Sequence, residues 1–252
     1  MKIPYKELFA PCTLSFWFVI FAMLVSVNNI NAEEKNSKTE TGQKSESKFN
    51  SDVKEASKPD DIWWSKWDVA VKDPNDPNEI LEAKWKAIIN VLQSKDQDME
   101  QKKKIIDKIT SPIFDVDLMA KLSLGKTNWP KLTAQQQKDF TKLFAERIKS
   151  FYLEKTTLYN DQKVTFLPAI KNRNNIYIPM KLISSEKEIS ILYKFHKINE
   201  TEKSKMKIYW KIYDVEIEGV SVLLTYQSQF DDILRKGSVN DLFEQLEKPS
   251  TE

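Results

Sequence analysis

The spacing of apolar residues predicts helices in the first half of the chain. Between residues 79 and 156, apolar side chains recur every three or four positions, which is the period of an amphipathic helix. Thr133 is followed three residues later by Gln136, a capping box that marks a helix start. Gly125 is expected to end the helix before it. The pattern predicts helices over residues 79–92, 97–109, 115–124 and 133–156.

The period changes in the second half, where Ile, Val, Tyr and Phe partly alternate with Lys and Glu. This alternation is typical of antiparallel strands with one side facing solvent. The predicted strands cover residues 163–167, 176–183, 189–195 and 206–215. The turns between them are expected at residues 172–175, 184–187 and 199–204.

After the last strand the pattern becomes helical again. Residues 220–224 are expected to extend that strand, and a helix is expected from Tyr226 to Lys236. Ser238 with Asp241 predicts the cap of a final short helix ending at Glu247. This order predicts an α+β fold, with N-terminal helices packed on one face of a curved antiparallel sheet and further helices at the C-terminus.

The N-terminal segment has the layout of a secretory signal peptide. Lys2 and Lys6 precede an apolar run from Leu14 to Val27, and Ala32 offers a small residue before a cleavage point. The run is about 14 residues long, which is shorter than the roughly 18–20 residues of a membrane-spanning helix. We therefore predict a signal peptide over residues 1–32, with an uncleaved anchor as the alternative.

Residues 33–61 are predicted to be a disordered linker, because their Glu, Lys, Ser, Thr and Asn side chains cannot bury enough apolar surface to offset the entropy of ordering. An aromatic group follows, formed by Ile62, Trp63, Trp64 and Trp67. We interpret it as a short amphipathic helix whose tryptophans cap the main core. The alternative is a contact with a membrane interface or a partner, where tryptophan is favoured.

Composition excludes several classes of function. The net charge is +2 with 30% charged residues, which lacks the strongly basic face of a nucleic-acid-binding protein. The four glycines stand apart in the sequence, so a phosphate-cradling loop is absent. Cys12 is the only cysteine, and it would be removed with the signal peptide. The mature chain would then have no disulfide or cysteine metal site.

Candidate catalytic residues are few. His196 is the only histidine, so no histidine cluster is possible, and its position near a polar turn predicts a surface residue. The sequence Gly219-Val220-Ser221 resembles a nucleophile elbow, but Leu223 replaces the second glycine. Asp214 is the one carboxylate that a ligand-binding enzyme of this architecture would use, and a strand-end hydrogen bond is its simpler role. We predict that the chain is not an enzyme and that it needs no cofactor or metal.

Four segments share their pattern with a known family: FDVDLMAKLSLGKTNW (114–129), LTAQQQKDFTKLFAERIKSFY (132–152), YWKIYDVEIEGVSVLLTYQSQF (209–230) and ILRKGSVNDLFEQL (233–246). They resemble the MlaC / toluene-tolerance family of periplasmic phospholipid-binding proteins. The matching positions are Met119, Ala120, Gly125, Trp129, Thr133, Gln136, Phe140, Phe144, Tyr152, Trp210, Tyr213, Asp214, Glu218, Gly219, Val220, Ser221, Tyr226, Gln229, Phe230, Leu234, Gly237 and Leu242.

The resemblance covers about residues 79–248, and the chain departs from it in three places. Residues 33–61 and 62–67 look like additions, and Ser228 stands where the family pattern has an arginine. Residues 163–208 match in pattern only. The resemblance implies a single lipid-binding domain over residues 62–248.

The function implied by the resemblance is that of a carrier in the periplasm, an auxiliary component of an ABC transport system that maintains outer-membrane lipid asymmetry. The ligand would be a phospholipid, with its acyl chains in an apolar cavity. The partners would be an inner-membrane ABC transporter complex with its substrate-binding MCE protein, and an outer-membrane lipoprotein complex. No nucleic acid would be involved.

The resemblance also implies a cavity between the helical layer and the sheet; without it, the same apolar stripes would equally describe a closed core. The expected lipid-binding residues are Leu118, Met119, Leu122, Phe140, Leu143, Phe144, Ile148, Tyr152, Val215, Val220, Val222, Tyr226, Phe230 and Leu234. Docking to partners is assigned to charges expected at the cavity mouth, Arg147, Lys149, Arg235 and Lys236, whose simpler role is solubility. The alternative function is a membrane-tethered interaction module with a closed core and no lipid ligand.

Overall fold

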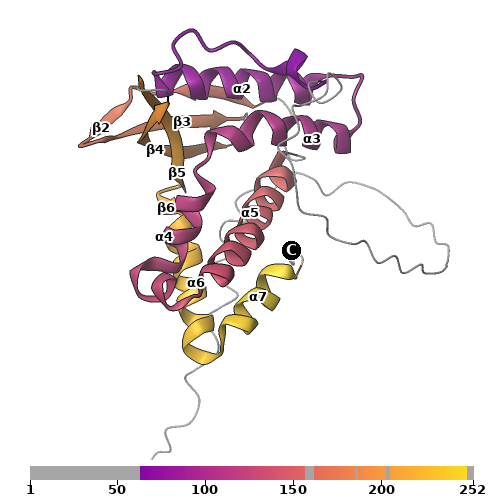
Figure 1. Ribbon diagram of the computed structural model, residues 1–252. Helices are drawn as coiled ribbons and strands as arrows, with labels where there is room; N and C mark the ends of the chain where they lie inside the picture. Colours follow the sequence, from indigo (N-terminus) through magenta and orange to yellow (C-terminus); the bar gives the residue numbers. More distant parts are fainter. Residues whose placement is uncertain (1–62, 157–161, 185–186, 203–204, 249–252) are drawn as a thin grey trace, which may run out of the picture. The chain divides into compact units, whose positions relative to one another are not determined.

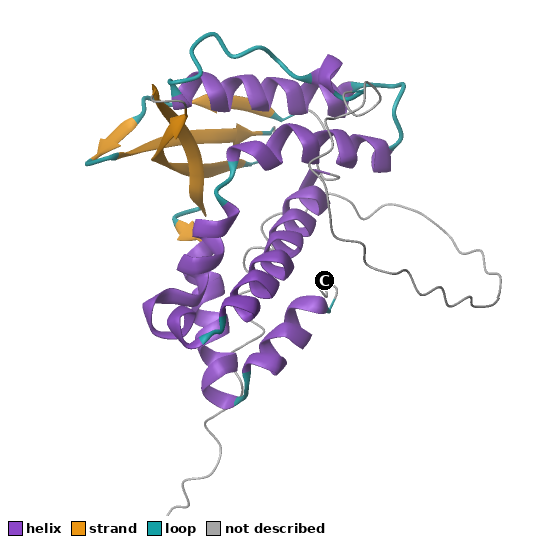
Figure 2. Cartoon of the chain, viewed as in Figure 1, coloured by secondary structure: helices purple, strands orange, loops and turns teal. Residues whose placement is uncertain are grey.

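The computed structural model describes residues 63–156, 162–184, 187–202 and 205–248. The predicted signal peptide, linker and Ile62 lie outside the described residues. A 3₁₀ turn at Ser65–Trp67 precedes the helices (Figures 1 and 2). The helices are α2 (Pro77–Gln93), α3 (Met99–Thr110), α4 (Val116–Asn128), α5 (Ala134–Thr156), α6 (Val222–Lys236) and α7 (Val239–Glu247). The strands are β1 (Lys163–Phe166), β2 (Ile170–Asn172), β3 (Asn175–Ile183), β4 (Glu188–Glu202), β5 (Lys205–Ile217) and β6 (Val220–Ser221).

The strands form one antiparallel sheet in the order β1-β3-β4-β5-β6, with β2 also paired to β3. Ile178 pairs with Tyr193, and Tyr193 pairs with Val215, which fixes the register across the three central strands. The register shifts between Lys194 and Phe195, so the β4–β5 pair contains a bulge. The alternation of side chains along each strand then gives the sheet two faces of different character.

One face of the sheet packs on α2 and forms the cluster that we call the sheet cluster. Its buried members from α2 are Ile80 and Leu81, and Figure 1 shows α2 running along the sheet. Burial of these side chains places the apolar stripe of α2 against the strands. The buried members from the rest of the chain are Ile113, Ile178, Met180, Tyr193, Phe195 and Ile212.

A second cluster, the helical cluster, lies among α4, α5, α6 and α7 and includes no strand residue. Its buried members are Met119, Ala120, Leu124, Leu132, Phe140, Phe144, Ile148, Leu223, Tyr226, Phe230, Leu242 and Leu246. A third, the α2–α3 cluster, joins Ala87, Ile88 and Val91 of α2 to Ile105, Ile106 and Ile109 of α3. The buried apolar side chains of the described residues therefore fall into three clusters.

Local sequence signals set several of the helix starts. The predicted capping box of α5 is present, because Thr133 Oγ1 accepts from the Gln136 amide and Gln136 Oε1 accepts from the Thr133 amide. The predicted box of α7 is present at Ser238 and Asp241. The Ser221 side chain caps α6, which therefore begins at Val222 and not at Tyr226 as the sequence pattern predicted.

The predicted fold class is confirmed: helices pack on one face of an antiparallel sheet and further helices follow it. Besides the start of α6, three further local predictions were wrong. Residues 199–202 continue β4 instead of forming a turn, because they pair with residues 205–208 of β5. The short strand β2 was missed, since its three residues are all exposed and carry no alternation. Gly125 has φ 68° and ψ 175°, so it kinks α4 without ending it, and the helix resumes to Asn128.

Candidate functional site

Most of the predicted lipid-binding residues come together, but in the helical cluster and not between helices and sheet. Met119, Phe140, Phe144, Ile148, Tyr226 and Phe230 are buried there, and Leu143, Tyr152, Val222 and Leu234 pack against it. The structure thus places ten of the fourteen predicted residues in one compact group. In this group the side chains of these residues pack against one another.

The other four predicted residues lie apart from this cluster. Val215 packs against the sheet cluster. Leu118 and Val220 are half-buried, and Val220 pairs with Ile217 in the β5–β6 ladder. Leu122 is 39% exposed, because it lies on the side of α4 that faces away from the buried Met119 and Ala120. Leu118, Leu122, Val215 and Val220 therefore lie outside the group that the other ten predicted residues form.

Four aromatic rings fill the centre of the helical cluster. Phe144 stacks on Phe140 with ring centroids 5.8 Å apart, and Phe230 meets Phe140 edge-on at 5.5 Å. Tyr226 meets Phe144 edge-on at 5.4 Å. Burial raises the pKa of Tyr226 to about 12, despite the opposing effect of Arg147. These distances are those of direct ring contact, so the centre of this cluster is closed.

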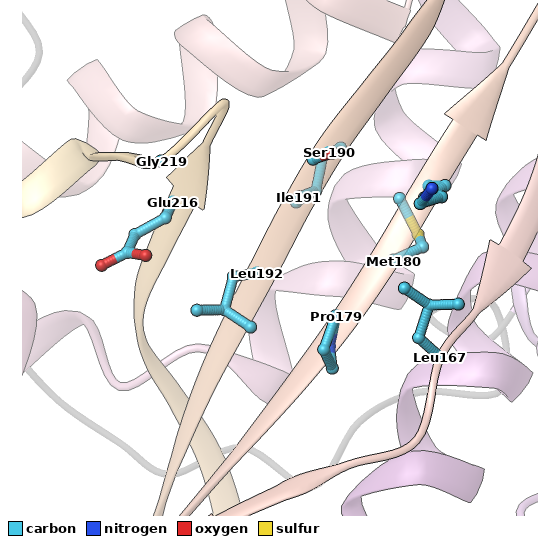
Figure 3. A pocket seen from close by; sticks show the side chains of 9 residues that line it. Leu167, Pro179, Met180, Ser190, Ile191, Leu192, Glu216 and Gly219 are labelled. Carbon is cyan, nitrogen blue, oxygen red and sulfur yellow. The ribbon is translucent and has the colours of Figure 1, made fainter.

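Two of the pockets in the described part of the chain bear on the site, and both open to solvent. The first lies on the face of the sheet opposite α2, where Pro179, Leu192 and Glu216 stand side by side across β3, β4 and β5 (Figure 3). Its volume is about 240 Å³. The second lies between α5 and the end of α7, beside Leu143 and Arg147, with a volume of about 280 Å³. Both volumes fall below the roughly 300–1,000 Å³ of typical small-molecule sites.

The three clusters meet at two aromatic residues. Phe114 packs against both the sheet cluster and the helical cluster, while Tyr152 of α5 packs against both the helical cluster and the α2–α3 cluster. Their rings stack, with centroids 6.3 Å apart and planes inclined by 10°. We call this junction the seam.

A polar group holds α3 to α5 beside the seam. Asp107 of α3 accepts hydrogen bonds from the Tyr152 hydroxyl at 2.7 Å and the Ser111 hydroxyl at 2.7 Å. Its other carboxylate oxygen pairs with Lys149 Nζ of α5 at 2.9 Å. We call these four residues the clasp. Two of its members belong to α5, so Asp107 connects the two helices through charge-assisted bonds.

The charges of the clasp reinforce one another. Burial disfavours the Asp107 carboxylate, but hydrogen bonds from Ser111, Lys149 and Tyr152 outweigh that cost and lower its pKa. The hydrogen bond to Asp107 raises the pKa of Lys149. Burial raises the pKa of Tyr152 to about 12, so it remains a hydroxyl donor at neutral pH. The clasp is therefore an ionised carboxylate surrounded by donors.

Asp214 anchors α6 to the sheet. One of its carboxylate oxygens accepts from the Ser221 hydroxyl at 2.8 Å and from Lys194 Nζ at 3.0 Å. The other accepts from the Leu223 amide at 3.2 Å. Lys194 also pairs with Glu216, and it retains its proton because these two carboxylates outweigh the effect of burial on its pKa. Asp214 is 4% exposed, and it has the structural hydrogen-bonding role that the sequence favoured.

His196 was predicted to lie at the surface, and this was wrong. Its Nε2 lies 2.8 Å from Asp115 Oδ2, and its ring meets Tyr213 edge-on at 5.7 Å. Asp115 also caps α4 by accepting from the Leu118 amide. The polar turn expected beside His196 is in fact strand, so the side chain stays within the sheet and reaches the start of α4. His196 is a link between β4 and α4.

The four predicted docking residues all have intramolecular partners. Arg147 donates to the main-chain oxygens of Gln245, Leu246 and Lys248 at 2.6–2.9 Å, which satisfies the C-terminal end of α7. Lys149 belongs to the clasp. Arg235 and Lys236 both pair with Asp232 and remain exposed. A docking role stays a prediction for all four, and Arg235 and Lys236 are the two with exposed side chains.

Sequence reasoning missed Asp107 and the role of Phe114. Asp107 lies among the buried Ile105, Ile106 and Ile109 of α3, and no pattern distinguishes it from an ordinary solvent-facing carboxylate. Phe114 lies in a segment that resembles the family, but its parallel bridge to Ile212, which joins helices to the sheet, has no signal in the sequence.

In the part of the chain that the structure describes, no group of three or more His, Cys, Asp or Glu side chains is arranged for a metal ion. No described helix is long and apolar enough to cross a membrane.

The chain matches the family model described as MlaC protein over residues 82–248. It therefore belongs to the MlaC family. It is 25% identical over 160 residues to the intermembrane phospholipid transport system binding protein MlaC of Haemophilus influenzae, covering 62% of this chain and 72% of the relative.

A similar fold occurs in a phospholipid-binding protein from Ralstonia solanacearum, solved in complex with a phospholipid. The TM-score is 0.56 at 18% identity, with 68% of this chain and 94% of that chain covered. This similarity supports the fold assignment alone. The strands β1 to β5, whose sequence matched the family in pattern only, lie within the residues that the family model covers.

Proposed function

We propose that this chain is a periplasmic phospholipid carrier, and that it moves lipids between outer-membrane and inner-membrane complexes without catalysing a reaction. Membership of the MlaC family and the phospholipid transport role in the name of the Haemophilus influenzae relative support the lipid ligand. The predicted signal peptide supports the location. The ligand would be held by apolar burial, with no cofactor.

The observation that carries this proposal is the convergence of three apolar clusters on the seam. Buried side chains usually form one contiguous core with smaller satellite clusters in each domain, whereas the described residues here form three clusters of comparable size. Phe114 and Tyr152 are the two side chains that each pack against two of these clusters. We propose that acyl chains enter where these two rings stack, separating the helical cluster from the sheet and α2–α3 clusters.

The energetics favour such an opening when a lipid is available. Each methylene moved from water to an apolar site contributes about 0.8 kcal/mol. Two acyl chains therefore gain on the order of 20 kcal/mol relative to water, before the costs of ordering the chains and separating the clusters. A ligand held this way leaves slowly into water. Transfer would require a partner that offers the chains a continuous apolar path.

The partners would be the complexes at the two membranes: an ABC transporter with its MCE protein at the inner membrane and a lipoprotein complex at the outer membrane. Docking through Arg235 and Lys236 would act on the rate of association and weaken with salt, as electrostatic steering does. The head group would remain at the mouth of the site. The described pockets supply no dedicated cluster of cations for a phosphate.

The test is extraction of purified protein with organic solvent, followed by mass spectrometry of the lipid fraction. We expect phospholipid in amounts comparable with the protein. Phe114→Glu should reduce bound phospholipid strongly, because a carboxylate at the seam must be desolvated or admit water. The variant for comparison is Val220→Glu, which places the same charge at a residue that the sequence predicted to bind lipid. If Val220→Glu loses its bound phospholipid and Phe114→Glu keeps it, the binding site lies at the start of α6 and not at the seam.

A closed-core interaction module is the competing function, and the tight ring contacts of the helical cluster favour it. The same extraction separates the two, because a module without a ligand would yield no phospholipid. Circular dichroism of each variant shows whether it has folded. A folded wild-type protein that carries no phospholipid and takes none up from vesicles would favour the module.

A further inference from the structure

Residues Trp63–Val71, which we call the strap, are a feature of this chain that lies before the family match at residue 82. The strap contains the 3₁₀ turn Ser65–Trp67. The rings of Trp64 and Trp67, together with Val69, pack against the α2–α3 cluster. Tyr152 packs against that same cluster, so the strap covers apolar surface that continues to the seam.

An ion pair ties the strap to α2. Asp68 pairs with Lys84 of α2 at 2.8 Å, and this partly buried pair fixes one end. Lys66 lies over the Trp67 ring at 5.3 Å from its centroid. Trp63 is 48% exposed, and it is not among the side chains packed on the α2–α3 cluster. Two neighbouring tryptophans of the strap therefore face different surroundings.

Trp67 has an unusual indole nitrogen. Nε1 is buried, and it has no hydrogen-bond acceptor within the part of the chain that the structure describes. An N–H group that loses water without gaining an acceptor carries a desolvation cost, and native proteins rarely leave such a group without a partner. The buried members of the α2–α3 cluster are Ala, Ile and Val, whose side chains carry no acceptor, and the Tyr152 hydroxyl that packs against it donates to Asp107. The Trp67 N–H is therefore open to an acceptor that a bound ligand would supply.

We propose that the strap forms one wall of the lipid site and that Trp67 Nε1–H donates to an ester carbonyl of the bound phospholipid. This inference rests on the proposed function. The indole nitrogen is a donor only, so its partner must be an acceptor. The ester carbonyls are the uncharged acceptors nearest the acyl chains. They can follow those chains into an apolar cluster at a much lower cost than the charged phosphate.

The test compares lipids that differ only in this acceptor. Delipidated protein is offered an equal mixture of a diester phosphatidylglycerol and its diether analogue with the same chains, and the bound ratio is measured by mass spectrometry. We expect the wild-type protein to favour the diester by about fivefold, the effect of one net hydrogen bond. Trp67→Phe keeps a ring in the cluster but removes the N–H, so its bound ratio should fall to about one.

Trp63→Phe is the matched control, because it makes the same chemical change in the neighbouring exposed ring. It should keep the wild-type preference. Equal diester preference in wild type and Trp67→Phe would overturn the assignment of the indole, while leaving the carrier function intact. A preference of about one in the wild type would also overturn it. If the wild-type protein bound neither of the two lipids, that result would instead contradict the carrier function, and the inference with it.

Discussion

The helical cluster and the seam are both apolar, but different interactions close them. The helical cluster is closed by direct ring contacts among Phe140, Phe144, Tyr226 and Phe230. The seam has one stacked pair, Phe114 and Tyr152, and is fastened beside it by the carboxylate of Asp107. The helical cluster therefore depends on close apolar packing, whereas the closure of the seam also depends on the ionised carboxylate of Asp107.

This difference indicates separate roles for the two regions. Most of the residues that resemble the family's apolar positions build the helical cluster, and they contribute to stability. We propose that the seam is the region that changes shape, because Phe114 and Tyr152 each pack against two clusters there and the clasp beside them joins α3 to α5. The following predictions test that division, beginning with the largest expected effect.

Phe144→Ala should destabilise the protein by about 3–5 kcal/mol, the usual cost of removing a buried phenylalanine ring. Phe144 is fully buried among three other rings. Chemical denaturation measures the free energy of unfolding. Leu224→Ala, at a position 65% exposed, is the control and should have little effect. A stable Phe144→Ala variant that binds more lipid would show that the helical cluster is itself the pocket.

Asp214→Ala should cost about 2–3 kcal/mol, because it removes a buried hydrogen-bond acceptor from Ser221, Leu223 and Lys194. Lys194 keeps Glu216 as a partner, which limits the loss. The variant should still bind lipid, since Asp214 anchors α6 and does not line the seam. Loss of lipid from a protein that remains folded would make Asp214 part of the binding site.

Asp107→Asn should open the clasp at a modest cost of about 1 kcal/mol, because the amide retains some hydrogen bonds but loses its charge. The expected result is an exchange of bound fluorescent phospholipid with vesicles that is several times faster than in the wild type. Glu100→Gln is the matched control on α3, since Glu100 pairs with Lys103 at the surface. Unchanged exchange in Asp107→Asn would separate the clasp from lipid entry.

The same clasp predicts a pH dependence. The pKa of Asp107 is lowered in the folded protein from an ordinary value of 3.8. Its stabilising contribution is therefore fully present above that value and is lost as pH falls through the lower folded pKa. Lipid exchange in the wild type should accelerate as pH falls below about 3.8. This acceleration of exchange should be smaller in Asp107→Asn. If exchange accelerates equally in both proteins, the pH dependence comes from carboxylates other than Asp107.

The smallest effect is expected for docking. Arg235→Glu combined with Lys236→Glu should slow transfer to a membrane partner by several-fold at low salt and leave bound lipid unchanged. Arg147 is kept, because its loss would also free the carbonyl groups at the end of α7. Transfer by the wild type should slow as salt rises. A salt-independent rate and a fully active double variant would exclude electrostatic docking through these residues.

The sequence predicted the elements well because their signals are local. The capping boxes at Thr133 and Ser238 depend on residues three apart, and both are present. The stripe of α5 with Phe140, Phe144 and Ile148 also correctly marked buried residues. The errors at residues 199–202 and at His196 have one cause: both depend on pairing with β5 or α4, which local patterns do not report.

The site was harder to predict than the fold for the same physical reason. Periodicity shows that Phe144 faces inward, but it does not show whether the facing surface is the sheet, another helix or a ligand. The structure places it among α4, α6 and α7 residues. Asp107 and Trp67 matter through single contacts made across the fold, and such contacts have no period in the sequence.

The most direct test of the seam is photo-crosslinking with a phospholipid that carries a diazirine in its acyl chain. Protein loaded with this probe is irradiated and digested, and the labelled peptides are identified by mass spectrometry. We predict labels on the peptides that contain Phe114 and Tyr152, with fewer on those of β3 and β4 that line the pocket opposite α2. Labelling confined to Leu167, Pro179 and Leu192 of that pocket would contradict entry of the lipid at the seam.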